Sequence, residues 1–195
     1  MYKLCSTEKS AAQQRQLEQA FLDLLLQMPY DDIRISEVCR QAGCSRKVFY
    51  RLFENKTDIL IALIDQTLLD FENYRPDPAQ CGSGNLHRFF AYWKSQHRLL
   101  SALSLSQGIG LLTERAIRHV LAEDSLVLKT FGAEESGFAR ETVIFFLSGV
   151  FSLVRDWYEQ GYDRSIDEMS AMLMSLLSTE PIKCRMPDVW NTLGM

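Results

Sequence analysis

The chain has 195 residues, 47% of them hydrophobic and 24% charged, and a formal net charge of −4 at pH 7. These values are typical of a globular protein with a sizeable core and exclude a disordered or low-complexity chain. The longest apolar run, Val143–Val154, is too short to cross a bilayer, and no basic-then-apolar leader opens the sequence. We therefore expect a cytoplasmic protein that does not contact a membrane.

The reactive residue types argue against catalysis. The five cysteines form no C-x-x-C pair, and the three histidines have no metal-ligand spacing with one another or with a cysteine. No phosphate-binding glycine loop, nucleophile elbow or zinc-protease helix is present. We expect no catalytic residue, no metal and no cofactor. Cys39 and Cys44 flank a predicted turn, where a redox sensor is the alternative to a plain core position.

The first predicted helix runs from about Ala11 to Met28 and ends at Pro29, which cannot continue a helix. Its apolar positions recur at helical spacing and form one stripe: Leu17, Phe21, Leu24, Leu25 and Met28. We expect this stripe to face the core of an amino-terminal unit.

The next segment, Ile35–Lys56, predicts two short helices joined by a tight turn. Apolar residues of the first helix share one face: Ile35, Val38, Cys39 and Ala42. Gly43 follows, where a residue that adopts positive φ lets a helix end sharply, and Ser45 stands at the next N-cap. The second helix has an apolar back and polar residues that face outward: Arg46, Lys47, Tyr50 and Arg51. This pattern predicts a helix-turn-helix.

Positive charge is concentrated on this element. Between Arg40 and Lys56 there are five cations and one anion. Residues 1–56 sum to +2 and the whole chain to −4, which leaves −6 for residues 57–195. An acidic protein that gathers cations on one short element is suited to a local polyanion such as nucleic acid. The alternative is a solvated helix face, which the agreement of cap, turn and charge disfavours.

The rest of the chain predicts further helices. Residues 57–75 form a linking helix whose apolar stripe is wide enough to face two partners, and the Pro- and Gly-containing segment 75–85 marks the domain boundary. A larger domain over 86–180 follows, with helices at about 86–103, 111–122, 125–131, 137–160 and 165–177, then a tail over 181–195. With the head at 1–56, this predicts an all-helical chain of about nine helices.

Within Arg34–Leu60 the sequence resembles the DNA-binding head of the TetR-type (tetracycline-repressor-like) transcriptional regulators. The residues that carry the resemblance are Ala42-Gly43-Cys44-Ser45, Phe49-Tyr50, Phe53, Lys56 and Ile59-Leu60. It covers about Gln14–Leu69 and continues loosely at Phe89–Trp93 and Phe146–Gly149, which resemble the C-terminal domain of one branch of that family.

The resemblance implies two kinds of DNA contact. Base edges in the major groove would be contacted by Arg46, Lys47 and Val48. Phosphates of the double-stranded DNA would be bound by Ser36, Ser45, Tyr50, Arg51 and Lys56.

Two positions depart from the family pattern. Arg34 stands where a small capping residue is usual, so we expect the cap to shift to Ser36. Lys47 stands where many relatives have glycine, so no operator sequence can be carried over from them.

A single helix-turn-helix makes few base contacts, and dimerisation is the usual way to double them. The helix over 137–160 is too apolar to be one-sided, so we expect it to form a four-helix interface with the last helix and their copies in a homodimer. The alternative is that its phenylalanines are internal core. The expected interface residues are Phe146, Val150, Leu153, Trp157, Met169, Met172, Leu173 and Leu176.

The aromatic cluster in 86–103 predicts a pocket for a small apolar or aromatic effector, although helical aromatics are more often core. The expected lining is Phe90, Trp93, Phe131, Phe146 and Val150, with His97 or Gln107 as the polar group.

The favoured interpretation is a ligand-responsive homodimeric regulator, a repressor that binds a palindromic operator. A second keeps DNA binding but replaces the effector by a protein partner, as in a ligand-independent regulator or activator. A third, a helical enzyme or cofactor carrier, is disfavoured because the histidines and carboxylates form no catalytic set.

Overall fold

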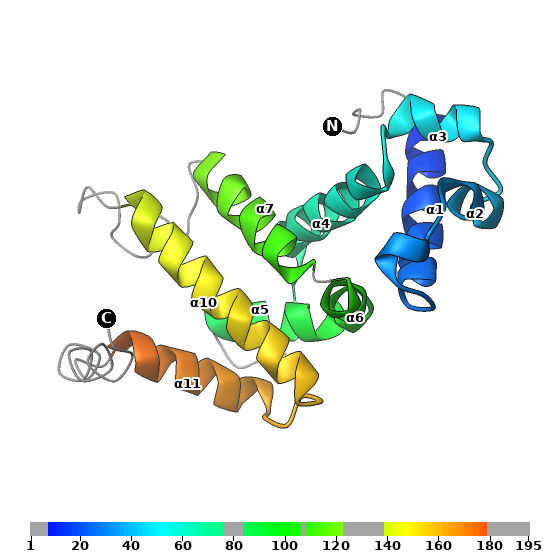
Figure 1. Cartoon of the computed structure of the whole chain (residues 1–195). Helices are drawn as coiled ribbons and strands as arrows, with labels where there is room; N and C mark the ends of the chain where they lie inside the picture. Colours follow the sequence, from blue (N-terminus) through cyan, green and yellow to red (C-terminus); the bar gives the residue numbers. More distant parts are fainter. Residues whose placement is uncertain (1–7, 76–83, 107, 123–138, 179–195) are drawn as a thin grey trace, which may run out of the picture.

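The computed structural model describes residues 8–75, 84–106, 108–122 and 139–178 (Figure 1). Within these ranges the chain forms nine α-helices and one 3₁₀-helix and contains no strand. The predicted all-helical fold is therefore confirmed. The helix expected at 125–131, the tail over 181–195 and the pocket residues Gln107 and Phe131 lie outside the described residues. None of the described helices is both long and apolar enough to span a membrane.

The amino-terminal head is built from three helices around one apolar core. Its elements, in chain order, are α1 (Glu8–Leu25), the 3₁₀-helix η1 (Tyr30–Asp32), α2 (Ile35–Gln41) and α3 (Arg46–Leu52). α1 contacts α2 and α3, and α2 contacts α3. The predicted stripes face inward, and four of their side chains are fully buried: Leu17, Phe21, Val38 and Phe49. Because each contributes roughly 1.5–3 kcal/mol when buried, this core fixes how α3 is held.

α4 (Lys56–Asn73) belongs to two groups of helices, since it contacts α1 on one side and α7 on the other (Figure 1). Its N-cap is Asn55, whose side-chain oxygen accepts from the Asp58 N–H at 3.0 Å. The Asp58 carboxylate accepts in turn from the Glu54 N–H at 3.0 Å. Ile59 and Ile64 are fully buried. The wide apolar stripe predicted for this helix therefore serves both groups.

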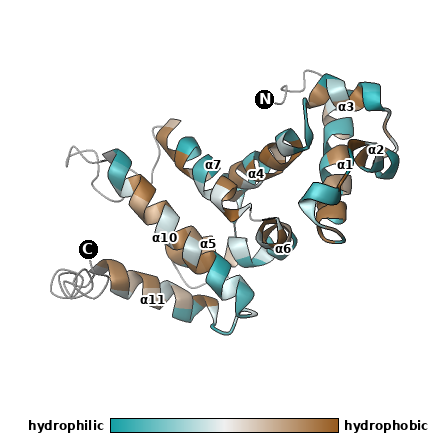
Figure 2. Cartoon of the chain, in the orientation of Figure 1, coloured by the Kyte–Doolittle hydropathy of each residue, from teal (hydrophilic) through white to brown (hydrophobic). Residues whose placement is uncertain are grey.

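The remaining helices form the larger part of the chain. They are α5 (Asn85–Ser95), α6 (His97–Leu105), α7 (Ile109–Ala122), α10 (Ala139–Glu159) and α11 (Ile166–Ser178). α10 packs on α5, α6 and α7, and α11 packs on α5. Figure 2 shows the apolar residues along α10 and α11, at the end of the molecule opposite α3.

The single helix expected over 86–103 is wrong, because the chain bends between α5 and α6. The N–H of Gln96 donates to the carbonyls of Tyr92 and Trp93 at 3.2 and 3.1 Å, and Gln96 has left the helical conformation at φ −87° and ψ 26°. The Ser95 hydroxyl donates to the Tyr92 carbonyl at 2.6 Å. Serine side chains that bond to nearby backbone compete with the helix in this way.

The carboxyl end of α4 is held by Arg88 from α5. Its guanidinium donates to the carbonyls of Phe71, Glu72 and Tyr74 and lies 4.6 Å from the centre of the Phe71 ring. The last carbonyls of a helix have no partner within the helix, and a cation there is favoured by the helix dipole. Arg88 therefore ties the end of α4 to the start of α5.

We expect Arg88→Met to lower the free energy of unfolding by about 1–3 kcal/mol, because the carbonyls lose a charged donor. The measurement is urea unfolding followed by circular dichroism. Arg75→Met is the control, since the exposed Arg75 also donates to the carbonyls of Glu72 and Tyr74. Equal losses for the two variants would contradict a special role for Arg88.

Candidate nucleic-acid interface

The turn between α2 and α3 has the geometry that the sequence predicted. Gly43 has a φ of 63°, and the N–H of Cys44 donates to the Cys39 carbonyl at 2.9 Å. The Ser45 hydroxyl then accepts from the Val48 N–H at 3.3 Å, so Ser45 is the N-cap of α3. A glycine in the left-handed region followed by a capping serine lets two short helices meet at a fixed angle.

The expected shift of the α2 cap to Ser36 is wrong. α2 begins at Ile35, and Arg34 is its N-cap residue. The Glu37 carboxylate accepts from the Arg34 N–H at 3.0 Å, which is the reciprocal half of a capping box. The N–H of Glu37, to which a small capping side chain would bond, donates instead to the Arg34 carbonyl at 2.9 Å, and Ser36 lies half-buried in the first turn.

The outer face of α3 carries four polar residues close together. Arg46, Lys47, Tyr50 and Arg51 are all exposed, while Phe49 and Leu52 behind them are buried. Positions i, i+1, i+4 and i+5 share one side of a helix. The apolar back thus turns three cations and a phenol toward solvent.

Two residues of α3 are held partly by the rest of the head. The Arg51 guanidinium donates to the Gln13 side-chain oxygen of α1 at 2.5 Å. Val48, expected to contact a base edge, is half-buried and packs against the core. The hydrogen bond to Gln13 therefore holds the Arg51 side chain in place on the surface, and only part of Val48 is accessible to a partner.

Lys56 has a different environment from the one expected. Its ammonium group donates to the carbonyls of Tyr30, Asp31 and Ile33 at 2.6, 3.2 and 3.3 Å. It also lies 4.3 Å from the centre of the Tyr30 ring. A lysine has three donor hydrogens, and all of them have an acceptor in the head. Lys56 thus closes the η1 turn, which revises its expected role as a phosphate contact.

We expect Lys56→Met to lower the free energy of unfolding by about 1–3 kcal/mol, because three carbonyls lose a charged donor and the cation–π contact disappears. Lys47→Met is the control, since this lysine is exposed and its loss is expected to change stability by less than about 0.5 kcal/mol. Thermal and urea unfolding measure both. An unchanged Lys56→Met protein would leave Lys56 available for a phosphate.

The expected dimer residues divide into two groups. Val150, Trp157, Met169 and Leu173 are at most 4% exposed. They are covered by helices of the same subunit, so the expectation that they form an interface is wrong. Phe146, Leu153 and Met172 are half-buried and Leu176 is exposed.

The most exposed apolar residues of α10 and one on α11 are not among the expected interface residues. Phe145 is 79% exposed and its neighbour Ile144 is 37% exposed, and Leu177 on α11 is 46% exposed. The sequence contained a signal for this exposure. Phe145 shares one helix face with Gly149 and Ser152, and these two residues are too small or too polar to form a core.

The expected effector lining is mostly packed interior. The rings of Phe90 and Trp157 have centroids 5.7 Å apart, and those of Trp93 and Phe151 are 5.0 Å apart. Val150 is also buried, whereas His97 is exposed at the α5–α6 junction. The expected lining residues in the described part of the chain therefore do not surround one open cavity.

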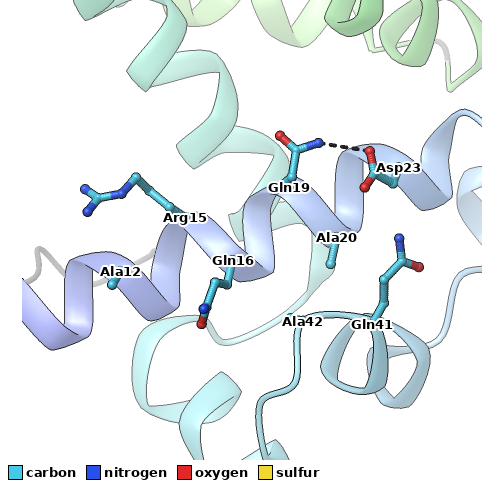
Figure 3. Close-up of a pocket in the computed structure, with 8 residues that line it drawn as sticks. All are labelled: Ala12, Arg15, Gln16, Gln19, Ala20, Asp23, Gln41 and Ala42. Carbon is cyan, nitrogen blue, oxygen red and sulfur yellow. Dashed lines mark hydrogen bonds between the residues drawn. The ribbon is translucent and has the colours of Figure 1, made fainter.

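Two surface grooves are present among the described residues. One, of about 540 Å³, lies on the outside of the head between α1 and α2, and Figure 3 shows its polar lining, where the Gln19 amide donates to the Asp23 carboxylate. The other, of about 300 Å³, lies where α1, α4 and the α5–α6 junction meet and includes His97. No group of three His, Cys, Asp or Glu side chains suited to a metal ion occurs in the described ranges.

Comparison with known proteins finds no matching family model and no matching curated protein. Solved structures do match. Lin0861 from Listeria innocua has a TM-score of 0.62 at 14% identity, over 90% of this chain and 94% of that one. The fatty acid degradation regulator FadR from Bacillus halodurans has a TM-score of 0.60 at 16% identity, over 91% and 98%. A TetR-family transcriptional regulator from Streptomyces coelicolor is 22% identical over 92% and 98%, with a TM-score of 0.36.

The likeness to the Listeria and Bacillus proteins covers the head and the helices beyond it. The fold and the capped cationic helix define a class of protein that has a helix-turn-helix head on an all-helical body. The chain has the same fold as these two proteins.

Proposed function

We propose that this protein is a sequence-specific DNA-binding transcriptional regulator that acts as a dimer. The exposed cationic face of α3 carries the proposal, because a capped helix with a buried back holds three cations outward in an otherwise acidic chain. The FadR protein of the same fold is described as a regulator, which agrees with this reading.

Recognition would use the amino-terminal turn of α3. Residues at the start of a recognition helix contact base edges in the major groove, and Arg or Lys side chains donate to the O6 and N7 atoms of guanine. Arg46 and Lys47 stand at this turn. Tyr50, Arg51 and Ser45 are the candidates for phosphate contacts, with Ser36 one helix earlier.

A second copy of the chain is the proposed occupant of the exposed apolar residues of α10 and α11, which are Ile144 and Phe145 on α10 and Leu177 on α11. Both helices lie at the end of the molecule opposite α3 (Figure 1). A two-fold dimer through these residues leaves both recognition helices open to DNA and favours a palindromic operator.

The ligand-responsive repressor remains our proposal for the regulation. Its support is the Trp93 indole, whose N–H is buried without a hydrogen-bond partner anywhere in the described part of the chain. Buried donors are nearly always paired, and this one lies in a packed aromatic interior, so the proposed effector would have to displace part of that packing and supply one acceptor to the indole.

We expect Arg46→Ala and Lys47→Ala each to reduce the preference for the operator over random DNA by about 1–3 kcal/mol, because base contacts carry the discrimination. The operator is first selected from a random oligonucleotide pool. Fluorescence anisotropy at one fixed salt concentration then measures both affinities.

The matched control is Arg118→Ala, which removes an exposed cation from α7. It should leave both affinities within about twofold, since single surface charges far from DNA change little. If the α3 variants weaken operator and random DNA equally, these side chains bind phosphates and do not read bases.

We expect Phe145→Arg to convert the dimer to a monomer without loss of helicity, because the ring is exposed within one subunit and a buried unpaired charge disfavours association. Light scattering on a sizing column is the measurement. Leu105→Arg, at a 65% exposed leucine on α6, is the control and should stay dimeric. A dimeric Phe145→Arg protein would move the interface elsewhere.

A further inference from the structure

The groove of about 300 Å³ lies between the head and the rest of the chain. α1 contributes Glu18 and Leu22, α4 contributes Leu63 and Asp70, and the α5–α6 junction contributes Leu99 with its polar neighbours. Ligand pockets typically span roughly 300–1,000 Å³, so this groove suits a small molecule. Its lining combines apolar side chains with carboxylates.

Glu18 is the unusual residue of this lining. Its side chain is 6% exposed, and within the described residues the donor to its carboxylate is the Gln14 amide at 2.7 Å. Burial raises the pKa of Glu18, and the Gln14 hydrogen bond and the charge of the exposed Arg15 offset this only in part. A buried carboxylate that lacks a cation at hydrogen-bond distance is costly.

The charges around the groove favour a cation as its occupant. Asp70 adds a second carboxylate, which accepts from the Gln66 amide at 2.7 Å. The guanidinium of Arg98 is engaged by the Asp23 carboxylate of α1. With Arg98 neutralised by Asp23, the remaining formal charges of Glu18 and Asp70 leave the groove acidic.

We propose that this groove binds a small organic cation of the arylalkylammonium class. The ammonium group pairs with Glu18, and the apolar part of the molecule lies against Leu22, Leu63 and Leu99. An ammonium ion next to a buried carboxylate forms a hydrogen bond between two charged groups. This bond is stronger than the hydrogen bond that Glu18 now accepts from the neutral Gln14 amide.

Because of the position of the groove, its occupant would change the affinity for DNA, and this step rests on the proposed function. It would bridge α1 of the head to α4 and α6, next to the Arg98–Asp23 ion pair. A molecule that binds only this arrangement of the head stabilises it by mass action. DNA affinity then changes by the difference in the cation's affinity for the DNA-bound and free arrangements.

The test is calorimetric titration of the full chain, without DNA, at pH 7. The probe is 2-phenylethylammonium, with 2-phenylethanol as its neutral counterpart and 3-phenylpropanoate as an anion. We expect the cation to bind about tenfold or more tightly than the alcohol, because only it pairs with a buried carboxylate, and the anion not to bind. Equal affinity for cation and alcohol overturns the proposal.

Glu18→Gln is the matched variant, since the amide keeps the shape and still accepts from Gln14. It should fold, because it removes a buried charge, and circular dichroism checks this. It should weaken the cation about tenfold and leave the alcohol unchanged. Glu8→Gln removes the same charge from the exposed start of α1 and should leave the cation's affinity unchanged. If both variants bind the cation like the wild type, Glu18 does not hold it and the proposal fails.

This experiment is separable from the proposed function. Cation binding is measured without DNA, so a chain that binds the cation but no DNA refutes the regulator and leaves the groove site intact. A chain that binds its operator but shows no cation preference refutes the groove site alone.

Discussion

The structure depends on the burial of one helix, α4, between two sets of partners at once. Ile59 and Ile64 are fully buried, and the helix contacts α1 of the head and α7 of the body. Both ends are fixed by polar groups, Asn55 at the start and Arg88 at the end. A helix packed on two sides and bonded at both ends has little freedom to move alone. Motion of either neighbour must therefore move α4 or break its contacts.

Polar links reinforce this packing on the side of the body. Arg115 donates to both oxygens of the Asp65 carboxylate at 2.7 and 2.6 Å, in the fork geometry that is strong for guanidinium pairs. The Tyr92 hydroxyl donates to the Thr67 carbonyl at 2.5 Å, and burial raises the pKa of this phenol. Because these bonds converge on α4 from α5 and α7, the body holds the helix as one unit.

The cations of the chain serve two different purposes. Lys56 and Arg88 use their hydrogens on backbone carbonyls at helix ends, where they hold the fold. Arg46 and Lys47 are exposed on α3 and remain open to a partner. From the sequence alone, these two groups of cations cannot be distinguished. Only the positions of the carbonyls in space separate a cation that stabilises the head from one that faces outward.

The features predicted correctly from sequence are those with local causes. Gly43 and Ser45 define the turn and the cap within a few residues, so the helix-turn-helix followed from the pattern. The errors about burial concern long-range contacts, because whether Val150 or Phe145 of α10 is buried depends on where α5 and α7 pack. The bend at Gln96 and the cap at Arg34 have local causes, but hydrophobic periodicity does not reveal the side-chain hydrogen bonds of Ser95 and Glu37. The expected lining residues Phe90 and Trp93 lie in packed interior because aromatics at helical spacing pack equally well against one another.

The place of α4 also determines how the two ends of the molecule would communicate. In the proposed dimer, α10 and α11 meet their copies at one end, and the spacing of the two α3 helices is set at the other. α4 has 18 residues and so a length of about 27 Å, which means that a tilt of about 5° displaces its far end by roughly 2 Å. Recognition helices must match a groove repeat of roughly 34–36 Å, so a shift of this size at each subunit is large for base contacts. A regulatory signal therefore needs only a small rotation of α4, and the groove beside Glu18 lies where α4 meets the head.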